Sequence, residues 1–530
     1  MRKNLLYVLL IFTVSTAVRL YPTILSGLPF STDSWPLIKN AESFVSNSPV
    51  PLGSEVFDDY NIYWPLSQVY GAVASEILSL APVDAMRILI PLASSFAPIV
   101  LYSFLKRLTG RVYPAFVAGL FLACGGPYGV FMAGVTKETF SSLFFMGSIY
   151  VFSALPPSAA AFAAFMILDS ALIAGHHLSY IVAFAITANV FLIEIFHPRL
   201  RGSPRRRGLM LAFSGVVGLI YYLGYALPGL KTVISFSDWL SAFSFQSVMF
   251  LAMFYVVARP KPRRMPNTWI AAPLIAYAGL LLNQYVPIVP AAPRLSAAAL
   301  FYAFILVSFG FLSVVGLYAV KELDLDVELY PVLLWVSAVM GLEGYAVFAA
   351  NPGLSLTLAY RLANFLIPAL AALASIGIHR LSLRSNGRFS RAVALLLVVF
   401  FSAALVSQSF SAVFLRENFL GYQWIYDIRE YRGALWLKHF GGDAVVYGDL
   451  KVSYLLGSYF GLRVDPGAGY AFLRFGGSSG SGNLFFAYRD MAENGYLLGP
   501  YGVELPGRWL ERLVGHGLIY SNAYTSVYML

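Results

Sequence analysis

Hydrophobic residues fill this chain in long runs, and polar residues are confined to the shorter stretches between them. Thirteen runs have 18 to 25 residues each, the length that an α-helix needs to cross a bilayer. The pattern therefore predicts a polytopic α-helical membrane protein. The expected spans are residues 4–21, 84–105, 111–132, 138–155, 157–174, 178–196, 208–226, 241–258, 267–286, 296–320, 329–350, 359–378 and 391–413.

Composition agrees with a membrane protein. The 530 residues are 58% hydrophobic and 12% charged, whereas soluble domains contain roughly a quarter charged residues. Residues 1–18 have the basic start and apolar middle of a signal peptide. They lack its small-residue cleavage site, so we expect a retained first helix. The single cysteine, Cys124, excludes an intrachain disulfide.

The basic residues are unevenly distributed along the chain. The formal net charge is +10, but the basic residues cluster in short loops between spans, so they do not indicate a nucleic-acid partner. With a cytoplasmic N-terminus, nineteen Lys and Arg fall in cytoplasmic segments, and seven fall in spans and outer loops. The positive-inside rule then predicts a multi-pass plasma-membrane protein in this orientation.

This orientation divides the chain into two expected domains. Residues 1–415 form a transmembrane domain, in which loop 22–83 is extracytoplasmic, and residues 416–530 form an extracytoplasmic tail. The tail mixes helical and strand patterns, which predicts an α/β domain. Within it we expect a helix at 429–440, a buried strand at 443–448, a flexible loop at 475–482, and a hairpin at 517–530 with its turn near Ser521 and Asn522.

Ionisable residues gather near the predicted outer ends of several spans. Charges at membrane depth are costly and usually face a cavity or a partner, so these residues are candidates for a functional site. They are Asp33, Asp58, Asp59, Lys137, Glu138, His176, His177, Glu343 and Arg361.

Each candidate also has a structural alternative, which the sequence leaves open. Thr136 could cap the fourth span, with Glu138 placed where the helix dipole favours an acid. The two histidines could hydrogen-bond at a helix end, and Arg361 could extend to lipid headgroups. The loop acids could be solvated, and Glu343 could pair with another helix. Asp33 has the weakest structural alternative because of its neighbours.

Several stretches resemble, in the same order, motifs of the catalytic subunit of archaeal and eukaryotic oligosaccharyltransferase, a C-type (GT-C) glycosyltransferase. "STDSWPLIKNAE" is similar to the first outer-loop motif, and "FDDYNIYWPLSQVYG" to a later part of that loop. "AGVTKE" is similar to the loop that carries the family's Asp-x-Glu. "AYRLANFLIPALAALASIGI" resembles the late span whose arginine meets the lipid pyrophosphate, and "YDIREYRGALWLKHFGGDAVVYGD" resembles the entry to the outer domain.

The resemblance implies a GT-C fold and a glycan donor carried on a polyprenyl (pyro)phosphate. Breaking the anomeric C–O bond leaves negative charge on phosphate, so the site needs a cation. By resemblance, Asp33 and Glu138 are the catalytic carboxylates and hold a divalent cation, Mg²⁺ or Mn²⁺. The residues implied to bind the donor phosphate are Arg361, Lys137, His176 and His177, and the aromatic residues of the substrate site are Trp35 and Trp64.

The chain also departs from the family. Lys137 stands where the family has the first acid of Asp-x-Glu, and a lysine there could replace the metal as the cation for phosphate. The loop between the ninth and tenth spans is short and free of acids. The family's Trp-Trp-Asp-Tyr-Gly corresponds to "VVYGDLKVSY", which has Asp449 but no tryptophan pair. Features that read a peptide are missing, so we expect an acceptor other than an ordinary Asn-x-Ser/Thr sequon.

The first hypothesis is therefore a membrane glycosyltransferase that moves a sugar or oligosaccharide from a polyprenyl-linked donor to a protein or glycan acceptor outside the cytoplasm. The alternative is a flippase or transporter, or a non-catalytic protein that binds lipid-linked glycans. Transporters often show repeated halves and charges near the middle of the bilayer, and this sequence shows neither clearly.

Overall fold

The computed structural model divides the chain into two compact units. We call residues 1–18, 93–131 and 140–409 the bundle unit, and residues 19–92, 132–139 and 410–530 the mixed unit. The structure describes residues 2–49, 57, 60–156, 158–197, 204–231, 235–258, 267–286, 294–383, 388–414, 424–476, 482–499 and 502–530. Asp58 and Asp59, most of the loop 475–482 and most of the loop between the ninth and tenth expected spans lie outside the described residues.

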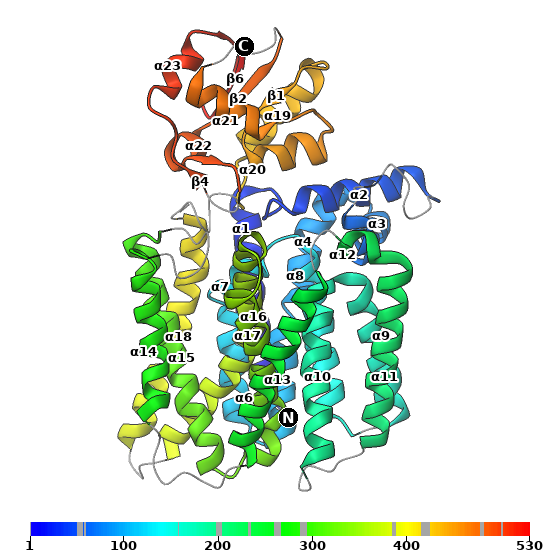
Figure 1. Ribbon diagram of the computed structural model, residues 1–530, viewed down its shortest axis with the longest axis vertical. Coiled ribbons are helices and arrows are strands. Elements are labelled where there is room, and N and C mark those ends of the chain that lie inside the picture. Colours follow the sequence, from blue (N-terminus) through cyan, green and yellow to red (C-terminus); the bar gives the residue numbers. More distant parts are fainter. Residues whose placement is uncertain are drawn as a thin grey trace. The chain divides into compact units, whose positions relative to one another are not determined.

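The bundle unit consists of helices that run side by side (Figure 1). The first is α1 (Arg2–Ser26), whose last residues belong to the mixed unit. The others are α5 (Ala97–Thr109), α6 (Val112–Cys124), α7 (Pro127–Phe131), α8 (Lys137–Ala154), α9 (Ala159–Gly175), α10 (His177–Phe196), α11 (Pro204–Tyr221), η3 (Tyr222–Ala226), α12 (Leu227–Lys231), α13 (Phe236–Ala258), α14 (Asn267–Leu282), α15 (Ala297–Glu322), α16 (Asp326–Phe348), α17 (Pro352–Leu383) and α18 (Arg388–Phe414).

The hydropathy prediction is confirmed at the level of the helices, since each of the thirteen expected spans coincides with helical segments. Among the described residues, nine helices are long and apolar enough to cross a membrane, and Val112–Cys124, Ala159–Gly175 and Pro273–Leu282 are shorter apolar helices. The protein is a multi-pass membrane protein. One span differs in detail, because α4 (Pro82–Ser94) and α5 are separated by a turn at Ser95 and Phe96.

Small residues allow two central helices of the bundle unit to approach closely. A Cβ atom added to Gly316 of α15 would lie 1.8 Å from the carbonyl oxygen of Leu373 on α17. The Ser313 hydroxyl of α15 donates to the carbonyl oxygen of Leu370 at 2.9 Å. Small residues at such contacts are typical of helix pairs in membranes, because van der Waals packing replaces the hydrophobic effect there.

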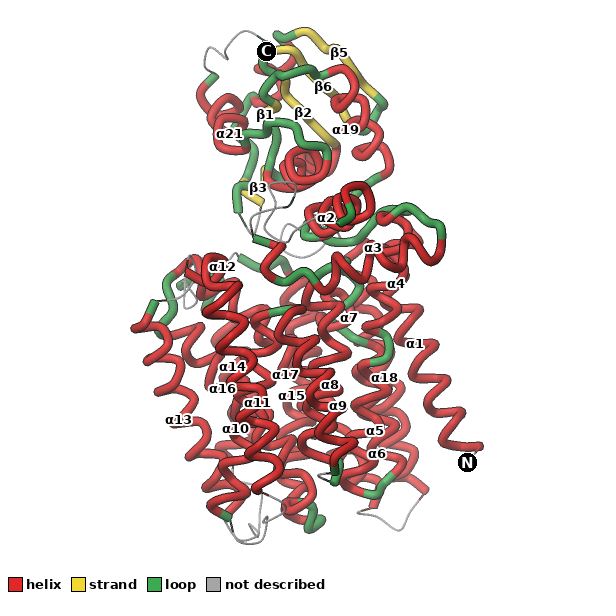
Figure 2. The backbone as a smooth tube through the Cα atoms, turned by 90° about the vertical axis from the view of Figure 1, so that its right-hand side faces the viewer, coloured by secondary structure: helices red, strands yellow, loops and turns green. Residues whose placement is uncertain are grey.

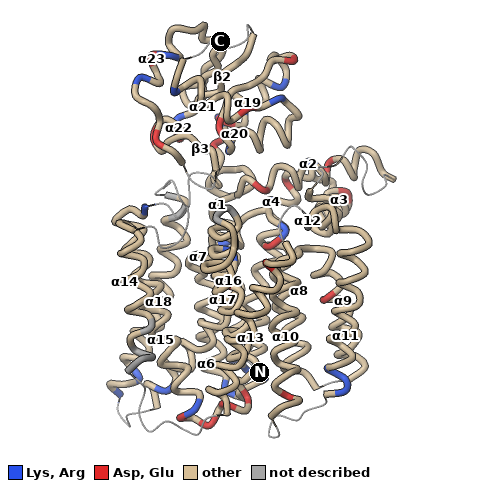
Figure 3. The backbone as a smooth tube through the Cα atoms, in the orientation of Figure 1, with Lys and Arg blue, Asp and Glu red and all other residues tan. Residues whose placement is uncertain are grey.

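The charged positions of the bundle unit lie mainly toward the ends of its long helices (Figure 3). Several of these charges are paired. Arg207 of α11 forms an ion pair with Glu194 of α10, and its Nη1 donates to the Tyr330 hydroxyl at 3.2 Å. Lys321 pairs with Asp326, and Arg380 pairs with Glu322. Basic residues that we assigned to cytoplasmic segments therefore also hold helix ends together. The orientation itself stays a prediction.

The mixed unit combines short helices with a small sheet, drawn in yellow in Figure 2. Its helices are α2 (Ser34–Asn47), η1 (Asn61–Tyr63), α3 (Leu66–Leu78), α4, α19 (Ile428–Phe440), α20 (Leu450–Ser453), η4 (Tyr454–Tyr459), α21 (Pro466–Phe475), α22 (Arg489–Asn494) and α23 (Trp509–Val514). Its strands are β1 (Val446–Tyr447), β2 (Leu484–Tyr488), β3 (Tyr496–Leu497), β4 (Gly502–Val503), β5 (Gly517–Ser521) and β6 (Thr525–Met529).

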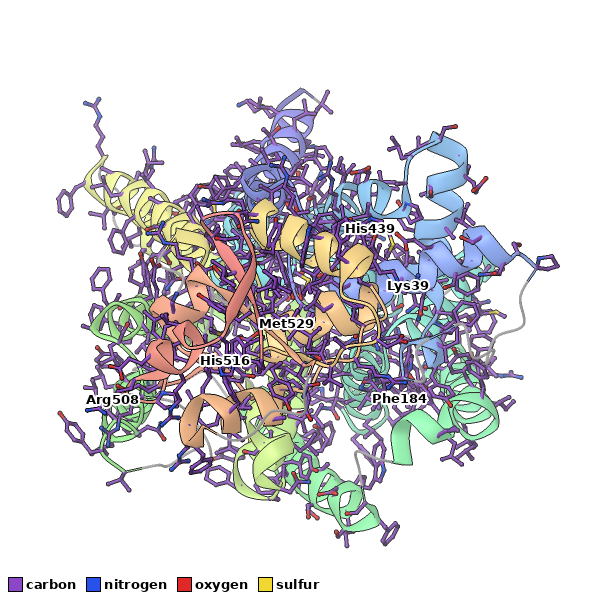
Figure 4. The ribbon with its side chains drawn as sticks, turned by 90° about the horizontal axis from the view of Figure 1, so that it is seen from above. Lys39, Phe184, His439, Arg508, His516 and Met529 are labelled. Atoms are coloured by element: carbon purple, nitrogen blue, oxygen red, sulfur yellow. The ribbon has the colours of Figure 1, made fainter. Side chains whose placement is uncertain are left out.

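The main sheet of the mixed unit has the order β1-β2-β6-β5. Strand β2 pairs parallel to β1 and antiparallel to β6, and β5 and β6 form a hairpin. Seen from above in Figure 4, His516 follows α23, and its ring lies 5.5 Å from that of Phe472 on α21. The helix expected at 429–440, the strand at 443–448 and the C-terminal hairpin are all confirmed, whereas the sequence did not predict β2.

Candidate functional site

The turn that precedes α2 places Asp33. Ser31 has a positive φ of 90°, and the Asp33 N–H donates to its hydroxyl at 3.3 Å. The Ser34 hydroxyl donates to the carbonyl oxygen of Phe30 at 2.6 Å and closes the turn. Asp33 occupies the N-cap position of α2, but its carboxylate makes no capping hydrogen bond with that helix. The Asp33 side chain is half-buried.

A second segment, residues 132–139, lies against this turn within the mixed unit. The Val135 N–H donates to the carbonyl oxygen of Phe30 at 3.0 Å. A Cβ atom added to Gly134 would lie 3.0 Å from the Cβ of Ser31, so glycine allows this close contact. The structure therefore joins the chain segments that carry Asp33 and Glu138, which come from different loops.

The segment ends in a capped helix. The Thr136 hydroxyl oxygen accepts a hydrogen bond from the Thr139 N–H at 3.0 Å, at the start of α8. Glu138 lies in the first turn of α8 and is 7% exposed. The capping alternative for Thr136 is confirmed. A carboxylate in the first turn is also favoured by the helix dipole, so the position of Glu138 agrees with its structural alternative as well.

Lys137 directs its ammonium group onto two aromatic rings of the first loop. Its Nζ lies 4.1 Å from the centroid of the Tyr60 ring and 4.9 Å from that of the Trp64 ring. The centroids of these two rings are 5.2 Å apart. Trp64 is fully buried, and Tyr60 is 41% exposed. Tyr60 was not a candidate from the sequence, since only the fold brings it to Lys137.

Trp35 is fully buried in α2. The centroid of its ring lies 5.3 Å from that of Tyr426, 5.8 Å from Tyr431 and 5.1 Å from Tyr459. These tyrosines come from the C-terminal part of the mixed unit, so Trp35 anchors α2 there. The roles of Trp35 and Trp64 in substrate binding stay predictions.

The other side of α2 makes a polar contact with the same part of the unit. The Tyr459 hydroxyl donates to Glu42 Oε1 at 2.8 Å, and Glu42 Oε2 lies 4.0 Å from Lys39 Nζ. Lys39 is exposed (labelled in Figure 4). Burial of Tyr459, together with the charge of Glu42, raises the pKa of the Tyr459 hydroxyl.

The remaining predicted residues belong to the bundle unit. His176 is buried and caps α10, because its Nδ1 accepts from the Ser179 N–H at 3.3 Å and lies 2.7 Å from the Ser179 hydroxyl. The rings of His176 and His177 are 5.1 Å apart. The helix-end alternative is thus confirmed for His176.

Arg361 lies on α17 and is half-buried. Its guanidinium carbon lies 6.0 Å from the centroid of the Tyr360 ring. That ring stacks on the ring of Phe131, with the two centroids 5.5 Å apart. Asp33, Lys137 and Glu138 thus belong to the mixed unit, while the histidines and Arg361 belong to the bundle unit.

The C-terminal part of the mixed unit buries a group of charged residues. Lys451 Nζ lies 2.9 Å from Glu430 Oε1 and 3.6 Å from Asp490 Oδ2. Burial raises the pKa of Glu430 to about 7, although the charge of Lys451 opposes this. Asp449 caps α20 through the Val452 N–H at 3.0 Å, and its other oxygen accepts from the Tyr488 hydroxyl at 2.6 Å. Burial also raises the pKa of Asp449.

Two buried charges inside apolar helices were not among the sequence candidates. Arg19 of α1 is fully buried, and Asp169 of α9 is 2% exposed. Asp169 lies near Ser214 of α11, whose carbonyl oxygen accepts from the Tyr180 hydroxyl at 2.8 Å. A single charge within an apolar run is the sequence signal that could have identified both residues.

Within the part of the chain that the structure describes, the donor set does not fit a metal ion held by the protein alone. Among the described residues, no group of three or more His, Cys, Asp and Glu side chains could hold a metal ion. Asp33 and Glu138 offer two carboxylates, but Lys137 adjoins Glu138 in the chain. A cation near Glu138 would experience the like charge of this ammonium.

Solved structures with a similar fold were found over most of the chain. The archaeal oligosaccharyltransferase AglB from Archaeoglobus fulgidus, in complex with an inhibitory peptide and a dolichol-phosphate, has a TM-score of 0.60 and 13% identity, covering 92% of this chain and 70% of AglB. The A. fulgidus enzyme tethered to a peptide with the NVT sequon has a TM-score of 0.59 and 12% identity, covering 92% of this chain and 69% of that chain.

The A. fulgidus enzyme in complex with zinc and sulfate has a TM-score of 0.56 and 14% identity, covering 86% of this chain and 62% of that chain. No protein-family model matches the chain, and no curated protein matches it. Because the sequence identities are this low, the structural similarity establishes the fold alone. The expected GT-C fold, a helical membrane bundle followed by a C-terminal region with a small sheet, is confirmed.

Proposed function

We propose that this protein is a membrane glycosyltransferase that transfers a sugar or oligosaccharide from a polyprenyl-(pyro)phosphate donor to an extracytoplasmic acceptor. The observation that carries the proposal is the 3.0 Å hydrogen bond from Val135 to Phe30. This bond joins the segments that carry Asp33 and Glu138, the two acids expected to act in the reaction. The fold shared with AglB, whose structure contains a dolichol-phosphate, supports a lipid-linked donor.

In the proposed reaction, an acceptor hydroxyl or amide attacks the anomeric carbon of the donor sugar. Asp33 accepts the proton that the acceptor releases, since a positioned carboxylate can act as a general base. The bond between the anomeric carbon and the phosphate oxygen breaks, and its electron pair leaves with the polyprenyl (pyro)phosphate. Displacement in line inverts the configuration of the anomeric carbon.

Arg361 and His176 are proposed to bind the donor phosphate. The guanidinium of an arginine can bind a phosphate through two parallel hydrogen bonds. Because Nδ1 of His176 accepts from the Ser179 N–H, the proton of its neutral ring lies on Nε2. An Nε2–H is a suitable donor to a phosphate oxygen. His177 stays a further candidate for this role.

The divalent cation expected on Asp33 and Glu138, Mg²⁺ or Mn²⁺, stays a prediction. Such an ion would stabilise the charge of the leaving phosphate. Since the donor set of the described residues does not fit a metal ion held by the protein alone, the proposed step uses only side chains of this chain.

We also propose that the N-terminus is cytoplasmic and that residues 416–530 are extracytoplasmic, in the plasma membrane. The excess of Lys and Arg in the predicted cytoplasmic segments supports this orientation. The acceptor would then be a protein, another lipid-linked glycan or a surface polymer.

Transfer by the purified protein tests the proposal. The protein in detergent is incubated with extracted polyprenyl-linked glycans, a sequon peptide and a membrane-glycan fraction, and each acceptor is followed by mass spectrometry. We expect transfer to at least one acceptor, and we expect Asp33→Asn to slow it by roughly 10²- to 10⁴-fold. Asp443→Asn, a change at an exposed acid of the same unit, is the matched control.

Each outcome has a defined meaning. Sugar on the peptide would make the sequon an acceptor and overturn the expectation drawn from the missing tryptophan pair. Donor binding without transfer to any acceptor, in the wild-type protein, would contradict the proposal. That result would favour a flippase, a transporter or a non-catalytic protein that binds lipid-linked glycans.

A further inference from the structure

Lys137 is held in a defined place by the first loop. Its Nζ lies 4.1 Å and 4.9 Å from the ring centroids of Tyr60 and Trp64. Trp64 is fully buried, and its backbone is held by two hydrogen bonds. The Trp64 N–H donates to the Asn61 carbonyl oxygen at 3.1 Å, and the Trp64 carbonyl oxygen accepts from Gln68 Nε2 at 3.3 Å. Two ring faces that meet one ammonium form a cation–π site.

Ring faces attract an ammonium without cancelling its formal charge. These two contacts therefore leave the ammonium positively charged, in a segment that is hydrogen-bonded to the turn of Asp33. Tyr60 is 41% exposed, so the pair of rings extends from the buried Trp64 to the surface of the mixed unit. Lys137 also begins α8, whose N-terminal end favours a negatively charged group.

We propose that Lys137, positioned by Tyr60 and Trp64, takes the place of the divalent cation and stabilises the polyprenyl phosphate as it leaves. This proposal rests on the proposed glycosyl transfer. When the anomeric C–O bond breaks, its electron pair stays on the phosphate oxygen, and the phosphate gains one negative charge. The Lys137 ammonium stabilises that charge and keeps its own protons, while the proton of the acceptor goes to Asp33.

The step is therefore balanced without a metal ion, and transfer should resist chelation. With the wild-type protein and the extracted polyprenyl-linked glycans, we expect EDTA to change the transfer rate by less than roughly twofold. Lys137→Met removes the cation that replaces the metal ion in this proposal, while Arg361 stays in place, and it should slow transfer by roughly 10²- to 10³-fold. Lys438→Met, at an exposed lysine of the same unit, should leave the rate unchanged.

Binding supplies a readout that does not depend on turnover. The probe is dolichyl phosphate in detergent micelles, titrated against the full-length protein and followed by tryptophan fluorescence. We expect Lys137→Met to weaken binding by roughly tenfold or more, the scale of one lost charge-assisted contact. Tyr60→Leu should weaken it as well, whereas Tyr60→Phe keeps the ring face and should retain binding. A purely structural tyrosine would not separate these two variants in this way.

A gain of metal dependence provides an independent test. Lys137→Asp places an acid next to Glu138, so this variant should bind Mn²⁺, detected by electron paramagnetic resonance, more tightly than the wild type does. If EDTA abolishes wild-type transfer and Mn²⁺ restores it, the proposal is overturned while the glycosyltransferase function stands. If the wild type transfers no sugar, the proposed glycosyltransferase function is wrong. The binding of dolichyl phosphate then tests the role of Lys137. Equal binding of dolichyl phosphate by wild type and Lys137→Met would overturn that role too.

Discussion

The mixed unit holds two lysines against pairs of aromatic rings, and their surroundings differ. Lys451, in the C-terminal part of the unit, is almost fully buried. Its Nζ lies 5.0 Å from the ring centroid of Tyr426 and 4.8 Å from that of Tyr488. It also pairs with two carboxylates, those of Glu430 at 2.9 Å and Asp490 at 3.6 Å. Its charge is thus neutralised within the fold.

Lys137 lies instead at the end of a short loop, beside the turn that carries Asp33. The rings of Tyr60 and Trp64 hold its ammonium, and Glu138 follows it in the first turn of α8. Two similar aromatic contacts thus occur in different electrostatic surroundings. Lys451 belongs to a buried cluster with two carboxylates, whereas Lys137 lies against two rings of the first loop, in a segment that is hydrogen-bonded to the turn of Asp33.

The largest effect that separates the two lysines should be on stability. Lys451→Met removes the cation from a buried pair and leaves carboxylates uncompensated, so we expect it to lower the free energy of unfolding by about 3–5 kcal/mol. Lys137→Met should lower it by less than about 2 kcal/mol, the upper range of a cation–π contact. Thermal unfolding in detergent, followed by tryptophan fluorescence, measures both. Equal losses would remove the distinction between the two lysines.

A second change should restore part of the loss at Lys451. In the background of Lys451→Met, Glu430→Gln removes one of the uncompensated carboxylates and keeps the shape of the side chain. We expect it to recover about 1–3 kcal/mol, the cost of leaving a charged group buried without its partner. If the double variant unfolds at the same temperature as Lys451→Met alone, desolvation of Glu430 is not the cause of the loss.

The same carboxylate predicts a pH dependence with a defined sign. Burial raises the pKa of Glu430 to about 7, and the unfolded chain has the ordinary value of 4.5. Between these values the folded state binds more protons than the unfolded state does, so the free energy of unfolding falls as the pH rises. Unfolding of the wild type at pH 5, 6, 7 and 8 should show this fall up to about pH 7. Glu430→Gln should flatten it, and a stability that rises over this range would contradict the raised pKa.

The smallest expected effect concerns the cap of α8. Thr136→Ala removes the hydroxyl that accepts from the Thr139 N–H, and it should cost about 1 kcal/mol of stability. Thr136→Ser keeps the hydroxyl and should retain most of that stability. Transfer by Thr136→Ala should decrease far less than transfer by Lys137→Met. A comparable decrease would mean that the start of α8, rather than the lysine charge, determines activity.

Much of the fold could be predicted from local patterns. All thirteen apolar runs are helical, because hydropathy over about twenty residues is a property of neighbouring residues. The hairpin β5–β6 was also predictable, since its turn and its two strands are contiguous. Strand β2 could not be predicted in this way. It is fully buried between β1 and β6, and it is stabilised by pairing with segments far away in the sequence.

The amino-acid sequence was enough to predict the membrane bundle and the identities of the candidate residues, because apolar runs and an ordered series of motifs are properties of the chain alone. The folded structure was needed to find that Val135 hydrogen-bonds to Phe30 and that Lys137 lies against Tyr60 and Trp64. It was also needed to find that Trp35 is buried among tyrosines of the C-terminal part of the mixed unit. Such contacts join loops that are remote in the chain, and the packing of the whole unit selects them, so no local pattern encodes them.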